Sequence, residues 1–154
     1  MANTYTDTFV GEDTLIINGR VLSNFGFGTV VEITCPNAIA GVDIGKGGNA
    51  VFSLQENGRQ ADVKVLVIKG SPDDVFLNAL NESFKSNFES KEAITGSFIS
   101  KVGDGKGKVT TTAWDLNGGI PTTPPNDKYD VAGDRTQVLM EYHYTFARGT
   151  RILS

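Results

Sequence analysis

The sequence is poor in the residues that most often carry chemistry. Its 154 residues include one cysteine, Cys35, and one histidine, His143. One cysteine excludes an internal disulfide and a thiolate metal cluster, and one histidine excludes zinc sites that need several. We expect Cys35 to be a small buried hydrophobe. No nucleophile or oxyanion motif accompanies His143, so we expect a surface or contact residue rather than a general base.

The sequence also lacks long apolar runs and an excess of basic charge. No run approaches the roughly 20 apolar residues that span a bilayer. The start, "MANTYTDTFVGED", has no signal-peptide pattern, so we expect a soluble protein made in a cytoplasm, with no membrane partner. The formal net charge of −4 argues against a dedicated nucleic-acid binder, which needs a concentrated basic face.

Motifs for cofactors and metals are missing as well. "GVDIGKGG" has neither the spacing nor the Ser or Thr of a phosphate-binding loop, and "VGDGKGK" lacks the spaced carboxylates of a calcium loop. Trp114, Tyr142 and Tyr144 would suit a platform that stacks on bases or sugars, but their alternation favours core or subunit contacts. The sequence therefore predicts no catalytic, cofactor-binding or metal-binding residue and no cofactor.

What the sequence does contain is strands and turns. Asn18-Gly19, Asn57-Gly58 and the turn in "VGDGKGK" each predict a hairpin, because these residues accept positive φ. A two-residue turn at Asn57-Gly58 would place Leu54 opposite Ala61 and Phe52 opposite Val63. The glycine-rich segments 36–50 and 117–133 are expected to be long loops.

One helix is predicted at 71–87. Ser71 suits the N-cap, Pro72 the first helical position, and two aspartates the first turn. The expected apolar stripe consists of Val75, Phe76, Ala79, Leu80 and Phe84. With about seven or eight strands, the expected fold is mainly β: one domain over 1–154, a β-sandwich or barrel-like antiparallel sheet with one flanking helix.

Such a sheet leaves unpaired strand edges, which a monomer must protect. One solution is to pair edges between subunits around a closed ring, since head-to-tail contacts give rings when the rotation closes and filaments when it does not.

Three parts of the sequence resemble tail tube proteins of contractile-tailed bacteriophages. They are "LIINGRVL", the segment from "CPN" through "GVDIGKGGNAVFSLQENGRQADVKVLVIKGSPDDVFLNAL", and the closing aromatic strand. The resemblance runs from about Asp13 to Phe146 and implies hexameric rings with a continuous inner β-barrel. The rings would stack into a tube that conducts DNA without binding it specifically. It also implies a virion protein assembled in the host bacterial cytoplasm. The implied partners are copies of itself and the sheath, tape measure, baseplate and tail terminator proteins.

The resemblance also suggests two sets of contact residues. We expect the N-terminal arm 1–9 and the segment 36–50 to contact neighbouring rings. The candidates there are Tyr5, Phe9, Ile39, Val42, Ile44 and Lys46. A lumen of acidic or neutral character would let DNA slide. The candidates for its wall are Ser53, Gln55, Gln60, Asp62 and Lys64.

Two other functions remain open at this stage. The same architecture serves phage-derived machines, the pyocin and type VI secretion tubes. A ligand-binding β-sandwich that uses Trp114 and the tyrosines belongs to a different class. An enzyme is the poorest fit, because no nucleophile, base and orienting partner occur together.

Overall fold

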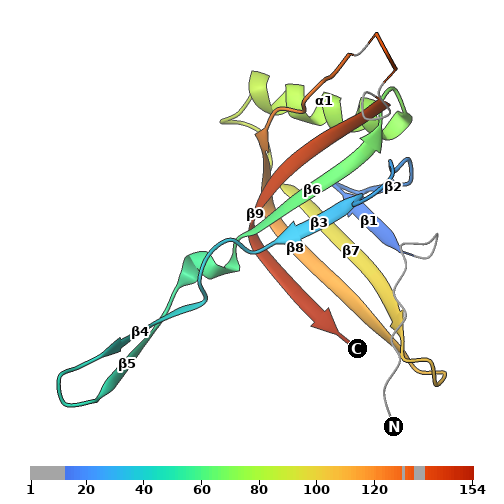
Figure 1. Ribbon diagram of the computed structural model, residues 1–154. Helices are drawn as coiled ribbons and strands as arrows, with labels where there is room; N and C mark the ends of the chain where they lie inside the picture. The colour runs from blue at the N-terminus through green and yellow to red at the C-terminus, as the bar shows by residue number, and fades with distance from the viewer. Residues whose placement is uncertain (1–12, 130, 134–137) are drawn as a thin grey trace.

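The computed structural model describes residues 13–129, 131–133 and 138–154. An antiparallel sheet is strongly curled, one helix, α1 (Pro72–Ser86), lies across one end of it, and a two-stranded hairpin projects from it (Figure 1). In spatial order the sheet contains β2 (Arg20–Leu22), β1 (Thr14–Ile17), β7 (Ile94–Gly103), β8 (Val109–Thr123), β9 (Leu139–Leu153), β6 (Ala61–Ile68) and β3 (Val31–Thr34). The hairpin consists of β4 (Ala40–Ile44) and β5 (Ala50–Leu54). The predicted class, mainly β with one flanking helix, is confirmed.

The core lies between the inner face of the sheet and α1. On β6 and β9, opposite residues share a face, and the register pairs Val63 with Tyr144 and Val65 with Tyr142. All four are at most 1% exposed. The alternation in the closing strand therefore marks a core strand. Tyr142 and Tyr144 cannot form a stacking platform, because neither ring reaches the surface.

Both core tyrosines keep their phenol groups protonated. Tyr142 Oη donates a hydrogen bond to Asp74 Oδ1 over 2.5 Å, and Tyr144 Oη donates one to Asn81 Oδ1 over 3.2 Å. Burial raises the pKa of both phenols well above the ordinary value of 10, and for Tyr142 the hydrogen bond to Asp74 adds to the effect. These bonds fasten β9 to α1.

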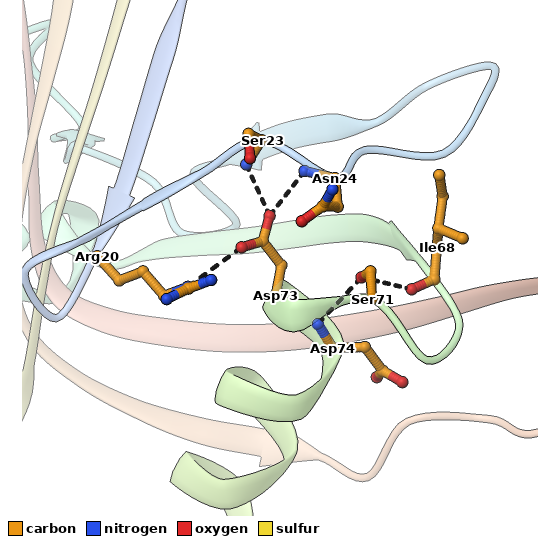
Figure 2. Close-up of polar contacts among 7 residues, drawn as sticks. All are labelled: Arg20, Ser23, Asn24, Ile68, Ser71, Asp73 and Asp74. Carbon is orange, nitrogen blue, oxygen red and sulfur yellow. Dashed lines mark hydrogen bonds and ion pairs between the residues drawn. The ribbon is translucent and has the colours of Figure 1, made fainter.

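The start of α1 is fixed by its capping residue. Ser71 Oγ accepts a hydrogen bond from the Asp74 amide over 3.3 Å and donates one to the Ile68 carbonyl over 2.6 Å (Figure 2). Gly70, at φ +79°, provides the sharp turn that an L side chain disfavours. The abrupt change from strand to helix is thus encoded locally, as the sequence predicts.

Asp73 joins the helix start to the chain after β2. Its side chain is fully buried and accepts hydrogen bonds from Arg20 Nε over 3.1 Å and from the amides of Ser23 and Asn24 over 2.6 and 2.7 Å (Figure 2). The helix dipole also favours a carboxylate here, so Asp73 stabilises the helix start and links it to the chain around β2.

The buried face of α1 differs in part from the expected stripe. Leu80 and Phe84 are buried as expected, but Val75 is 64% exposed and Leu77 is fully buried. Ala79, also expected in the stripe, is exposed, so the buried face includes Leu77 in place of Val75 and Ala79.

The prediction of a β-hairpin with its turn at Asn57-Gly58 is wrong. Residues Glu56–Arg59 form a single 3-10 turn, and β5 pairs with β4 instead of β6. The turn of the real hairpin lies at 45–49, where the Gly45 amide donates to the Asn49 carbonyl over 2.7 Å. Strand β6 pairs along all eight residues with β9, and this pairing buries the apolar side chains of both strands in the core.

The two segments that were expected to be long loops, 36–50 and 117–133, both contain β-strand. Segment 36–50 includes β4, and Asn117–Thr123 continues β8, which pairs there with β9. A Cβ on Gly119 would lie 2.4 Å from Cε1 of Phe146, so this glycine makes room for a core ring and does not mark a loop. Cys35 is exposed, contrary to the expectation of burial.

The other two predicted hairpins are confirmed. Asn18 and Gly19, with φ of 50° and 85°, join β1 to β2, and β7 pairs with β8 across the turn at 104–108. In the described part of the chain, no helix has the length and apolar character needed to cross a bilayer.

Candidate assembly surfaces

The hairpin β4–β5 has one face made only of apolar side chains. Directly opposite residues on antiparallel strands point to the same side, and the register pairs Val42 with Phe52. We call this side the apolar hairpin face; its residues are Ala40, Val42, Ile44, Ala50, Phe52 and Leu54. The other side pairs Gly41 with Ser53 and Asp43 with Val51.

The apolar hairpin face is open to solvent. Phe52 is 75% exposed, Ile44 73% and Leu54 63%. The hairpin projects away from the sheet, so the core does not cover this face (Figure 1). An isolated two-stranded hairpin is at best marginally stable in water, and contiguous exposed apolar surface marks an interaction site. The geometry therefore indicates a surface that a partner covers.

The hairpin is attached to the sheet at its base. The Gln55 amide donates to the Ile39 carbonyl over 2.8 Å, and Asn37 Nδ2 donates to the Asn57 carbonyl over 2.9 Å. A Cβ on Gly58 would lie 2.6 Å from the Ala38 carbonyl oxygen. This close packing at the base sets the direction in which the hairpin projects.

The structure places most of the predicted ring-contact residues on this hairpin. Val42 and Ile44 belong to the apolar hairpin face, Ile39 precedes β4 and is 73% exposed, and Lys46 lies exposed in the turn. Tyr5 and Phe9 lie outside the described residues. The sequence reasoning missed Phe52 and Leu54, because its incorrect register placed them opposite core residues of β6.

The predicted lumen residues fall into two separate places. Ser53 and Gln55 lie on or beside the hairpin. Gln60 directly precedes β6, and Asp62 and Lys64 lie on that strand. The shared surface that the incorrect register implied does not exist. Their assignment to a lumen stays a prediction.

Opposite the core, strands β3, β6 and β9 carry a polar face. We define this polar face by Glu32, Thr34, Asp62, Lys64, Glu141, His143 and Thr145. Glu141 Oε1 contacts His143 Nε2 at 2.8 Å and Lys64 Nζ at 3.3 Å. Asp62 Oδ1 accepts from Thr145 Oγ1 over 3.0 Å.

The charges on the polar face do not favour tight binding of a polyanion. This face carries three carboxylates and one lysine, and the lysine is paired with one of the carboxylates. A shallow hollow of about 350 Å³ lies over it. Such a surface offers no concentrated positive charge to hold a polyanion. Within the described residues, no group of three or more His, Cys, Asp or Glu could hold a metal ion.

The segment after β8 is fastened by one lysine. Lys69 Nζ forms an ion pair with Asp127 Oδ1 at 2.5 Å and donates a hydrogen bond to the Lys128 carbonyl over 3.3 Å. It also lies 4.2 Å from the centre of the Tyr129 ring. The hydrogen bonds from Lys69 and then Tyr129 lower the pKa of Asp127, and the hydrogen bond to Asp127 raises the pKa of Tyr129. These contacts orient the segment and form no reactive site.

The chain matches no family model and no curated protein sequence. It is similar to a chain in the cryo-EM structure of the sheath/tube terminator, in its extended state, of an extracellular contractile injection system, PVC. That match has a TM-score of 0.64 and 11% identity, and covers 96% of this chain and 97% of the other. A chain of the PVC sheath–tube complex in the extended state gives a TM-score of 0.57 and 9% identity, covering 92% and 88%. At these identities the likeness is one of fold. Both structures come from an injection system, so they do not single out the bacteriophage tail tube that the sequence resembles.

Proposed function

We propose that this chain is a structural, ring-forming subunit of the tube of a contractile, phage-tail-like particle. The observation that carries the proposal is the apolar hairpin face, which the described part of its own chain leaves uncovered. The likeness in fold to chains of the PVC structures supports it, because those structures comprise a sheath–tube complex and a sheath/tube terminator.

The hairpin favours assembly with copies of the same chain over binding of a small ligand. It projects from one side of the molecule (Figure 1), so a contact that it makes with a different surface of an identical neighbour is head-to-tail. Contacts of this type repeat from copy to copy and generate rings or stacks. In this proposal Ile39, Val42 and Ile44 lie in the ring-to-ring contact, together with Phe52.

The finer parts of the proposal follow the resemblance to tail tubes. Six copies form each ring, and residues 1–9 contribute to stacking. The polar face lines the lumen, where its paired lysine and surplus carboxylates let DNA pass in a phage. Sheath, tape measure, baseplate and terminator proteins are the expected neighbours. In a phage-derived injection system, the same wall would conduct that system's cargo.

A second candidate is the terminator ring that closes such a tube. It is favoured by the PVC terminator structure, which gives the higher TM-score and covers nearly all of both chains. A terminator would form a single ring and stop, whereas a tube subunit would continue to stack.

Electron microscopy of the purified full chain, with light scattering over a range of concentrations, tests the proposal. Tubes or stacked rings support the tube subunit, and discrete single rings support the terminator. A chain that stays monomeric at every concentration would refute both, and a ligand-induced shift of that monomer would favour a binding module.

A further inference from the structure

A small apolar pocket lies where the C-terminal end of α1 meets the end of β8. We call it the helix-end pocket; it is lined by Asn81, Phe84, Lys85, Phe88, Pro121, Thr122, Thr123 and Pro124. Phe84 is 4% exposed and Phe88, just beyond the helix, is 64% exposed. Two aromatic rings and two prolines thus form an apolar recess at the surface.

The size of the pocket suits one aromatic ring. Its volume is about 180 Å³, and an apolar cavity of about 150 Å³ is known to accept benzene. Its rim carries no unbalanced charge at Lys85, because Lys85 Nζ pairs with Glu82 Oε1 at 3.0 Å. An apolar side chain could therefore enter without burying an unpaired cation.

We propose that the helix-end pocket receives Phe52 from the hairpin of a second copy of this chain. This inference rests on the proposed function and names the surface that the hairpin meets. Phe52 is the one aromatic residue of segment 40–54, and the most exposed of the four large residues on the apolar hairpin face. Aromatic side chains that fill pockets dominate the energy of protein interfaces.

The positions of the two features support a contact between copies. The hairpin and α1 lie at opposite ends of the molecule, separated by the curled sheet (Figure 1). The hairpin of one chain therefore cannot fill its own pocket. A protrusion at one end and a matching recess at the other produce a repeating head-to-tail contact.

Charge substitutions test the two sides of this contact. Phe52→Asp and Phe88→Asp should each raise the concentration needed for assembly about tenfold or more. Two matched controls should leave it unchanged: Ser53→Asp, on the other side of the same hairpin, and Val75→Asp, on an exposed part of α1. Circular dichroism of each variant monomer establishes that the fold is kept.

Crosslinking shows whether the two surfaces meet while both phenylalanines stay in place. In a Cys35→Ser background, one variant carries Val42→Cys, opposite Phe52, and the other carries Lys85→Cys, on the pocket rim. A short bismaleimide should link the two variants when they are mixed and assembled, and should link neither variant to itself.

The outcomes separate this inference from the proposed function. If the wild-type chain assembles but Phe88→Asp assembles equally well, or the mixed variants do not crosslink, the pocket is not the receptor and only this inference fails. A wild-type chain that never assembles would overturn both proposals.

Discussion

Replacing Asp73 by alanine removes the carboxylate that joins α1 to the chain after β2. The change leaves the amides of Ser23 and Asn24 without their acceptor and Arg20 without its partner. A hydrogen bond to a charged group contributes about 1.5–3 kcal/mol. Both amides lie in partly buried surroundings and can regain some hydration, so we expect a loss of about 2–4 kcal/mol in the free energy of unfolding.

Arg20 provides the internal comparison. Its side chain is 39% exposed, and an ion pair at that exposure contributes about 1 kcal/mol or less after solvent screening. Arg20→Ala also removes the cation–π contact with Phe76 at 5.4 Å, which adds at most about 1 kcal/mol at such a site. The two backbone hydrogen bonds, and not the ion pair, should therefore dominate the effect of Asp73→Ala.

Urea unfolding followed by circular dichroism measures both variants, at a dilution where the wild-type chain is monomeric. Asp73→Asn is the conservative variant: one amide oxygen can still accept from Ser23 and Asn24, so it should recover part of the loss. The reasoning is refuted if Asp73→Ala and Arg20→Ala lower the free energy of unfolding by the same amount.

Three further predictions concern the core and the arm. Gly119→Ala should cost about 1–3 kcal/mol in thermal or urea unfolding, because its Cβ would overlap the Phe146 ring; an unchanged midpoint would contradict the packing. Tyr142 and Tyr144 have raised pKa values, so their contribution to stability is complete below the unfolded value near 10 and is lost as the pH rises above it. Tyrosinate absorbance should show these two ionising only on unfolding, and ionisation of all four tyrosines in the folded chain would refute this. Deleting residues 2–9 should leave a folded subunit that no longer stacks; normal tubes in negative-stain images would contradict that.

Local signals predicted the helix and two hairpins from sequence. The cap at Ser71, the proline after it and the glycines with positive φ act within a few residues, so their effect can be read directly. The buried face of α1 was less predictable. Val75 and Leu77 are both apolar, and only the position of the sheet decides which of them is buried.

Distant pairing explains what the sequence did not predict. Asn57-Gly58 is a strong hairpin signal, yet β6 pairs with β9 about eighty positions later, where Val63 meets Tyr144. No local pattern shows that this partner is available. Gly119 was interpreted as a loop residue for the same reason, since the ring that requires a glycine there, Phe146, comes from β9.

The error in register also hid the apolar hairpin face, which is the main candidate surface for assembly. Pairing β5 with β6 placed Phe52 beside Val63, inside a core, and left the polar residues of the hairpin as the apparent functional surface. With β5 paired to β4, Phe52 joins Val42 on an exposed apolar face. Because a pleated strand alternates sides at every residue, one wrong partner reverses the interpretation of a whole segment.

The arrangement of the hairpin separates folding from assembly. Strands β4 and β5 form a sheet of their own, and the described core residues all come from outside segment 40–54. Changing Phe52 should therefore leave the free energy of unfolding of the monomer nearly unchanged, while changing Val63 or Tyr144 should lower it. A large apolar residue that stays exposed in the monomer does not stabilise its fold, and its exposure lowers the solubility of the chain. Coverage by a neighbouring copy would offset that cost, and the stability of the assembly, not of the subunit, is the quantity that Phe52 should control.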